Sequence, residues 1–126
     1  MAKWVDVGMS GTLLVISAAA MVLTAFAHSF FGEKRLISPI LALDVAIMRI
    51  PLARQVLRGA WHLTSVLMIL NALAVIWPGT PSVLVGATGA VWLAVGLLDA
   101  VLTRGKHIGW PLLSAAGLFA VLGVVA

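Results

Sequence analysis

The sequence predicts an all-α membrane protein, a four-helix transmembrane bundle with an interfacial amphipathic segment between helices one and two. Of its 126 residues 63% are hydrophobic and only 10% are charged, whereas a soluble domain carries about 25% charged residues. Seven of the eight basic residues lie in two of the connections between apolar stretches, and only Lys3 lies elsewhere. We therefore treat residues 1–126 as a single transmembrane domain.

Four stretches are long and apolar enough to be helical spans, a length that takes about 20 residues. They cover residues 7–31, 56–77, 82–103 and 108–126. The Pro78-Gly79-Thr80-Pro81 turn joins the second and third, because proline stops a helix interior and suits a first helical turn. The basic turn Arg104-Gly105-Lys106-His107 joins the third and fourth.

The segment over residues 36–55 differs from these spans in its charges. Its apolar residues are interrupted by Asp44, Arg49 and Arg54, and Pro39 and Pro51 bracket its middle. We expect an amphipathic helix in the cytoplasmic interface, with the arginines among the lipid headgroups. A fifth span here would place the two basic connections on opposite sides of the membrane.

The basic residues also predict the orientation. With four spans, the first and third connections share a side, which the positive-inside rule assigns to the cytoplasm. Both termini are then outside. As an alternative, Lys3, the apolar stretch and Ala25-Phe26-Ala27 imitate a cleavable signal peptide, whose removal would expose His28 as a copper-binding N-terminus. The apolar stretch is longer than a usual signal core, which opposes this reading. Bases at the ends of spans also exclude nucleic acid as the partner.

Small residues indicate how the helices pack. Helix–helix contact in lipid depends on close approach of small side chains. The third span places Ser82, Gly86, Ala90 and Ala94 four residues apart on one ridge. This ridge fits either the interior of the bundle or contact with a second subunit. Asn71 is expected to form a hydrogen bond across helices.

The tryptophans indicate the membrane interfaces. Tryptophan favours this belt because its ring is apolar and its N–H requires a polar partner. Trp4 and Trp77 fall at the outer interface, and Trp61 and Trp110 near the inner one. Trp92 falls at mid-depth, where we expect it to serve packing.

Five polar residues fall in one layer near the cytoplasmic ends of the spans. They are His28, Glu33, His62, Asp99 and His107. Ionisable groups in spans are costly and are candidate functional groups. Histidine with carboxylate suits zinc, iron or manganese, and His28 with His62 could ligate haem iron axially.

Two other interpretations of this layer remain open. The histidines can form structural hydrogen bonds between helices, with Asp99 paired to Arg104 or Arg58 and Glu33 paired to a nearby base. The layer can also be part of a proton or ion pathway. The sequence has no H-E-x-x-H pattern and no histidine pair at i, i+4, so each ligand of a metal would come from a different element.

Three stretches together resemble a group of short bacterial integral membrane proteins with no assigned activity. They are residues 28–37 (HSFFGEKRLI), Trp61-His62, and residues 105–111 (GKHIGWP). The group has an H-S-x-x-G-E pattern after its first span and a Trp-His pair that opens its second. The resemblance implies a protein of the bacterial inner membrane, and it singles out His28, Glu33, Trp61, His62 and His107.

These observations favour a non-enzymatic accessory or scaffolding subunit of a membrane complex. Its partners would be the lipid bilayer and other membrane subunits or a second copy. One alternative is a metal- or haem-binding protein, and a second is a small oligomeric transporter, which the lack of charge at mid-depth disfavours. The chain has no cysteine and no G-x-S-x-G pattern, so an enzyme is not expected.

Overall fold

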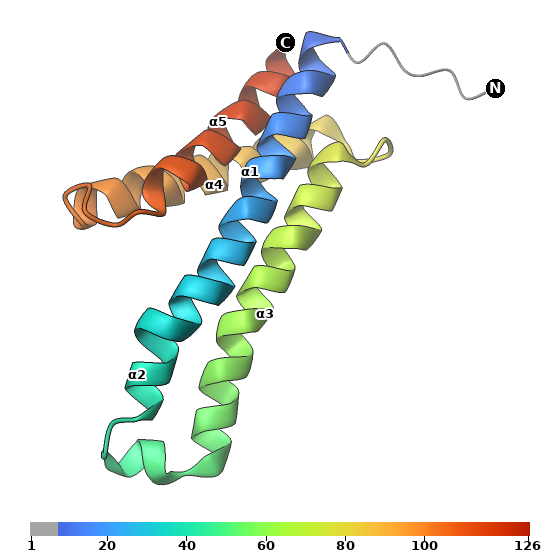
Figure 1. The fold of residues 1–126 in the computed structure, drawn as a ribbon. Coiled ribbons are helices and arrows are strands. Elements are labelled where there is room, and N and C mark those ends of the chain that lie inside the picture. Colours follow the sequence, from blue (N-terminus) through green and yellow to red (C-terminus); the bar gives the residue numbers. More distant parts are fainter. Residues whose placement is uncertain (1–7) are drawn as a thin grey trace.

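The chain folds into two helical hairpins that pack against each other (Figure 1). The computed structural model describes residues 8–126, and across these residues every regular element is helical. The first hairpin begins with α1 (Met9–Gly32), which continues through the π-helix η1 (Glu33–Ile37) into α2 (Ser38–Leu41). A short 3-10 helix, η2 (Ala46–Arg49), leads into α3 (Pro51–Ile76). Lys3, Trp4 and Val7 lie outside the described residues.

The second hairpin consists of α4 (Ser82–Leu102) and α5 (Trp110–Val125). Proline starts two of these helices, since Pro51 and Pro111 each occupy a first helical turn where no intrahelical N–H is required. At the end of α4, Arg104 and Gly105 adopt positive φ angles of 53° and 72°. The left-handed conformation at Arg104 lets the N–H of Gly105 bond to the carbonyl of Ala100 at 2.7 Å, which closes the helix.

Three helices are long and apolar enough to cross a membrane: Met9–Leu41, Pro51–Ile76 and Ser82–Leu102. The chain is therefore consistent with an integral membrane protein. The fourth helix, α5, is apolar but has only 16 residues. At 1.5 Å per residue it is about 24 Å long, less than the roughly 30 Å of the hydrocarbon core.

The prediction of a separate interfacial helix over residues 36–55 is wrong. Residues up to Leu41 extend the first helix, and residues from Pro51 onward already belong to α3. The π-helix explains this continuity, because its wider turn lets the backbone enter Pro39 without ending the helix. Arg54 is exposed, and it donates a hydrogen bond to the carbonyl of Leu41 at 2.7 Å, at the end of α2.

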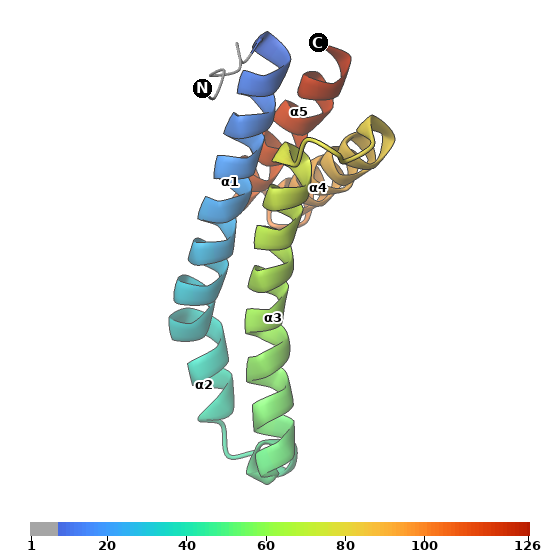
Figure 2. The same cartoon turned by 90° about the vertical axis from the view of Figure 1, so that its right-hand side faces the viewer.

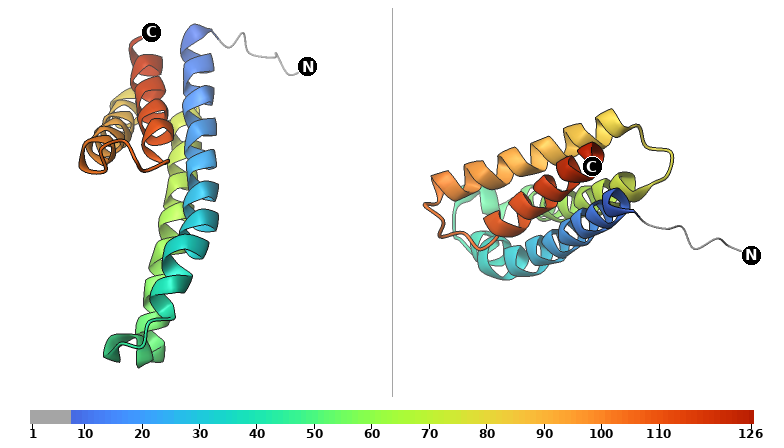
Figure 3. Two further views of the ribbon diagram at one scale, coloured as in Figure 1. Left: turned by 60° about the vertical axis from the view of Figure 1, so that its left-hand side comes forward. Right: turned by 90° about the horizontal axis from the view of Figure 1, so that it is seen from above.

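The two hairpins differ in extent. α1 and α3 lie side by side along their length, and the α4–α5 hairpin packs obliquely against the end that carries the chain termini (Figures 2 and 3). The opposite end of the first hairpin, which includes α2 and η2, extends beyond the second (Figure 2). Contacts between α1 and α3 must therefore hold this end together.

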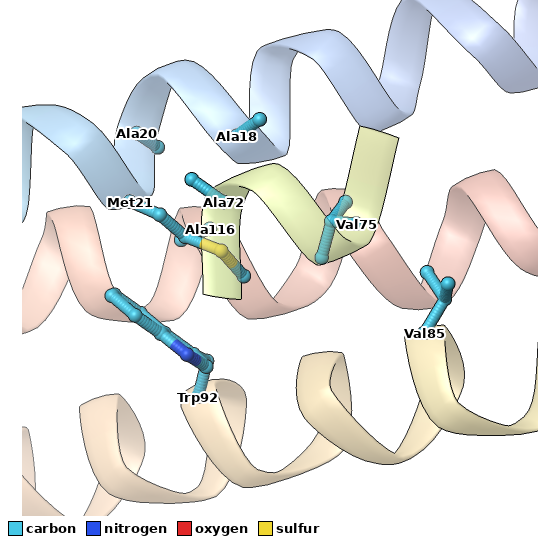
Figure 4. Close-up of a cluster of buried hydrophobic side chains, with 8 residues drawn as sticks. All are labelled: Ala18, Ala20, Met21, Ala72, Val75, Val85, Trp92 and Ala116. Carbon is cyan, nitrogen blue, oxygen red and sulfur yellow. The ribbon is translucent and has the colours of Figure 1, made fainter. Parts of the chain in front are cut away.

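The core lies where α1, α3, α4 and α5 meet (Figure 4). Met21 and Ala116 are fully buried there, and Trp92 is 8% exposed. The indole N–H of Trp92 donates to the Asn71 side-chain oxygen at 3.3 Å. This bond joins α3 to α4 and confirms both the packing role predicted for Trp92 and the interhelical bond predicted for Asn71. The cluster consists of Ala18, Ala20, Met21, Ala72, Val75, Val85, Trp92 and Ala116.

Glycine allows α4 and α5 to approach closely. A Cβ atom on Gly117 would collide with backbone atoms of Leu93 and Gly89, and one on Gly96 would collide with Ser114. The buried face of α4 is thus Val85, Gly89, Trp92 and Gly96. The predicted ridge is not this face, because Ser82, Ala90 and Ala94 are exposed and Gly86 is only half-buried.

Candidate functional site

Polar side chains gather between α1 and α3 on the part of the hairpin nearer η1. α1 provides His28 and Ser29, and η1 provides Glu33. α3 provides Arg58, His62 and Ser65, whose spacing of four and three residues places all three on one face of the helix. The two helices run side by side, so these faces meet.

The side chains form one continuous hydrogen-bonded chain. Glu33 Oε2 lies 3.0 Å from His62 Nε2, and His62 Nδ1 lies 2.9 Å from the Ser29 hydroxyl oxygen. The Ser29 and Ser65 hydroxyl oxygens are 2.8 Å apart. The Ser65 hydroxyl oxygen lies 3.0 Å from His28 Nδ1. Four hydrogen bonds therefore connect the Glu33 carboxylate to the imidazole of His28, five residues before it in the chain.

The Glu33 carboxylate has three partners. Besides His62, the Arg58 guanidinium and the Ser38 hydroxyl each donate to its Oε1 at 2.8 Å. The pair with Arg58 confirms the prediction that Glu33 binds a nearby base. The π-helix is the reason that Ser38 can take part, because its backbone bonds join residues five apart and it brings position 38 over position 33.

The bonding pattern permits the chain to carry a proton. A hydroxyl donates one hydrogen bond and can accept others. In one arrangement His28 donates to Ser65, Ser65 to Ser29, Ser29 to His62, and His62 to Glu33. When each group passes its proton to the next, from His28 through Ser65 and Ser29 to His62, Ser65 is left donating to His28 and Ser29 to Ser65. His62 then donates from both of its nitrogens. The two arrangements differ by one proton carried from His28 to His62, which is the connectivity of a proton relay.

Trp61 fixes one end of this chain. Its indole stacks on the His28 ring with centroids 4.1 Å apart and planes at 10°. The indole N–H donates to the His28 carbonyl oxygen at 2.9 Å. Gly32 makes room for this ring, since a Cβ atom there would overlap the indole. Glycine is thus favoured at this position of the H-S-x-x-G-E pattern because a side chain there would overlap the Trp61 ring.

Asp99 and His107 form a second polar pair in the α4–α5 hairpin. His107 Nδ1 lies 2.5 Å from Asp99 Oδ2. The prediction that Asp99 pairs with Arg104 or Arg58 is wrong, because the turn after α4 brings His107 back over the last turn of the helix. The Thr103 hydroxyl accepts a bond from the His107 backbone N–H at 3.3 Å and holds this turn.

A cavity of about 400 Å³ connects the two polar groups. It lies between α1, α3 and the start of α5, and its lining is mostly apolar. His28, Arg35, Trp61 and His107 line it, together with apolar residues such as Leu112 and Leu113. The imidazoles of His28 and His107 therefore face one space, although His107 forms no direct bond to the α1–α3 chain.

The five predicted ligands thus divide into a connected group, His28, Glu33 and His62, and a separate pair, Asp99 and His107. Within residues 8–126, no three or more histidine, aspartate and glutamate side chains are arranged to hold a metal ion. Both ring nitrogens of His62 are engaged, so it could ligate a metal only by giving up one of these bonds. Metal binding at these residues stays a prediction.

The sequence does not predict the serines of this hydrogen-bonded network as site residues. Ser29 and Ser65 look like weakly polar interruptions of a span, and Ser38 was assigned to the interfacial segment. The one available signal was the spacing of Arg58, His62 and Ser65 along a helix face. It needed a partner face on α1, which the sequence does not specify by itself.

Comparison with known proteins gives no relative of this fold or site. No protein-family model, curated protein sequence or solved structure matches the chain. The resemblance to short bacterial membrane proteins therefore stays a prediction, and the functional argument depends on the geometry.

Proposed function

We propose that this chain is a membrane protein of four spans that acts as a non-enzymatic accessory or scaffolding subunit. Support for a fourth span comes from α5, which returns antiparallel along α4 and also packs on α1. A membrane can thin around a helix that is a few ångströms short. The described residues contain no soluble domain, and the connections between helices are short.

The observation that carries the proposal is the outward face of α4. Ser82, Ala90 and Ala94 are exposed there, beside large apolar side chains such as Val91, which is 62% exposed. Lipid tails satisfy large apolar side chains, but a row of small ones favours close approach of another helix. The α4–α5 contact uses a different face, so this row is available to another membrane subunit or a second copy.

The proposed orientation places both termini on the periplasmic side of a bacterial inner membrane. The start of α1, the end of α5 and the Trp77–Pro81 connection lie at one end of the first hairpin, and the Leu41–Pro51 connection lies at the other (Figure 1). On or near the second end are the basic residues that favour the cytoplasm, which are Lys34, Arg35, Arg49, Arg54 and Arg58. Because the sequence has no cysteine, a single cysteine introduced at Gly79 or at Ala46 can be labelled with an impermeant maleimide in intact cells. Labelling at Gly79 alone is expected.

The partner surface is tested by photo-crosslinking in native membranes. A photoreactive amino acid is placed at position 90 in one variant and at position 91 in the other. Both side chains are exposed, and successive residues differ by about 100° around a helix at nearly the same depth. We expect a defined protein adduct from position 90 and mainly lipid adducts from position 91. Equal protein adducts from both would contradict a partner on this ridge.

Metal or haem binding remains a second candidate, which one observation favours. His107 is held through Nδ1 by a carboxylate, an arrangement that orients many metal-ligating histidines. His28 is likewise held through Nδ1 and lines the same cavity. Elemental mass spectrometry of the purified protein, beside a His28→Ala/His107→Ala double variant, tests it. Stoichiometric metal lost in the variant would support this candidate, and a metal-free wild type with intact fold would remove it.

A small oligomeric transporter is the weakest of the three. Its coupling site would be expected near mid-depth, where Asn71 is already bonded to Trp92. The proton relay supports it in part, but the relay lies toward one end of the first hairpin.

A further inference from the structure

We propose that the cavity between α1, α3 and the start of α5 binds the phosphate headgroup and adjoining chain of an anionic lipid. At about 400 Å³ the cavity has the volume of a small-molecule site. The inference is independent of any partner of α4.

Three polar side chains point to an anion. Arg35 lines the cavity, and its guanidinium lies over the Phe31 ring, 5.1 Å from the ring centre. His28 and His107 have their Nδ1 atoms engaged, which leaves each Nε2 to face a ligand. The Arg35 guanidinium can donate to phosphate oxygens, and each histidine can donate as well when it carries a proton on Nε2.

The charge balance around the cavity also favours an anion. The three described carboxylates are already paired: Glu33 with Arg58 and His62, Asp44 with Arg49, and Asp99 with His107. Within residues 8–126, five cations have no carboxylate at ion-pair distance. They are Lys34, Arg35, Arg54, Arg104 and Lys106, and two of them precede His107 in the α4–α5 turn. A surplus of this kind at a membrane interface attracts anionic headgroups.

The rest of the lining fits a hydrocarbon chain and not a free anion. Phe31, Leu36, Met68, Leu112 and Leu113 line the cavity beside the polar groups. A soluble phosphate would leave this apolar surface in contact with water, whereas an acyl chain covers it. The combination of an apolar wall with convergent donors is typical of sites that fix an amphipathic ligand.

The test is native mass spectrometry of the detergent-purified protein with lipids of identical acyl chains. Phosphatidylglycerol is compared with phosphatidylcholine, with a fatty acid, and with glycerol phosphate. We expect one phosphatidylglycerol to be retained at least about fivefold more tightly than phosphatidylcholine, the preference that one added cation–anion contact gives at a membrane surface. No preference would overturn the proposal. If glycerol phosphate were retained as tightly as phosphatidylglycerol, the ligand would not be a lipid. If the fatty acid were retained more tightly, the site would not recognise a phosphate group.

Matched variants locate the site. Arg35→Gln is expected to weaken retention about fivefold, whereas Lys34→Gln, which removes the same charge from a neighbour outside the lining, stays within about twofold. Leu112→Trp fills the cavity and should abolish the preference, whereas Leu118→Trp on the exposed face of α5 should not. Helix content and elution volume verify that each variant folds. Equal losses in the two charge variants, or normal retention in Leu112→Trp, would mean that the lipid binds elsewhere.

Discussion

Replacing Gly32 with alanine tests whether the close contact between α1 and Trp61 organises the site. A Cβ atom at position 32 would overlap the indole ring, so the ring must move. Its movement would break the stack on His28, whose ring centroid is 4.1 Å away, and the 2.9 Å hydrogen bond to the His28 carbonyl. The backbone of Gly32 is helical, so the variant introduces no backbone strain.

The expected size of the effect follows from these two contacts. A hydrogen bond of this kind contributes about 1 kcal/mol net, and an aromatic pair contributes about 0.5–1.5 kcal/mol beyond its burial. Alanine recovers about 1 kcal/mol through its helix propensity. The net result is a loss of about 1 kcal/mol in the free energy of unfolding. Gly59→Ala is the matched control, because nothing lies within 4 Å of its Cβ position, and it should gain about 0.5–1 kcal/mol.

The assay is reversible SDS denaturation in mixed micelles, followed by tryptophan fluorescence. The chemical shift of the Trp61 indole N–H, assigned with a Trp61→Phe variant, reports the contact itself. In Gly32→Ala we expect both a lower midpoint and a shifted indole signal. A variant as stable as Gly59→Ala with an unchanged indole signal would refute the reasoning, because the ring would then not occupy the space above Gly32.

Three further predictions concern helix packing, hydrogen bonds and ion pairs, and the same denaturation assay measures the stability of each variant. Gly117→Ala, where a methyl group meets backbone atoms of α4, should lose about 1–3 kcal/mol, whereas Gly86→Ala, with 3.9 Å of clearance, should not lose stability. Ser17→Ala removes a fully buried hydroxyl that donates to the carbonyl of Ala116 on α5 at 2.6 Å and should lose about 1–3 kcal/mol; an unchanged midpoint would mean that this bond does not join α1 to α5. Glu33→Gln should destabilise the protein because Arg58 and His62 lose a charged acceptor. Asp44→Asn, in an exposed pair, should change stability by less than about 0.5 kcal/mol. Equal effects of the two variants would refute a special role for Glu33.

The sequence was most informative about the apolar helices and least informative about their ends. Three of the four expected spans are present as long apolar helices, since hydropathy depends on composition alone. The extension of α1 to Leu41 could not be predicted in the same way. Pro39 and the charges at 33–35 usually end a span, and the π-helix that carries the backbone past them has no sequence signal of its own.

The sequence predicted the depth of the candidate site residues in the membrane, but not which of their side chains contact one another. His28, Glu33 and His62 were placed in one layer, and the structure brings them into one hydrogen-bonded chain. Which side chains touch depends on the rotation of α1 against α3, which composition does not define. For the same reason the sequence leaves open whether the small-residue ridge at Ser82, Ala90 and Ala94 packs inside the bundle or against a second subunit. The structure shows that α4 packs through Gly89 and Gly96 instead.

The position of the polar chain follows from the unequal lengths of the two hairpins. The α4–α5 hairpin covers only one end of α1 and α3, and that end is held by small apolar residues and by glycine contacts. Toward the other end α1 and α3 mainly contact each other, with the start of α5 beside them at the cavity. Lipid provides no hydrophobic force to join them. Hydrogen bonds join α1 to α3 toward this end, as side-chain packing joins the helices at the first end.

Two bonds between the helices, from Arg58 to Glu33 and from Trp61 to His28, would be enough to join them. The serines add an unbroken path between two imidazoles, one of which faces a cavity. A purely structural role gives no reason for that continuity, whereas passage of a proton between His28 and His62 does.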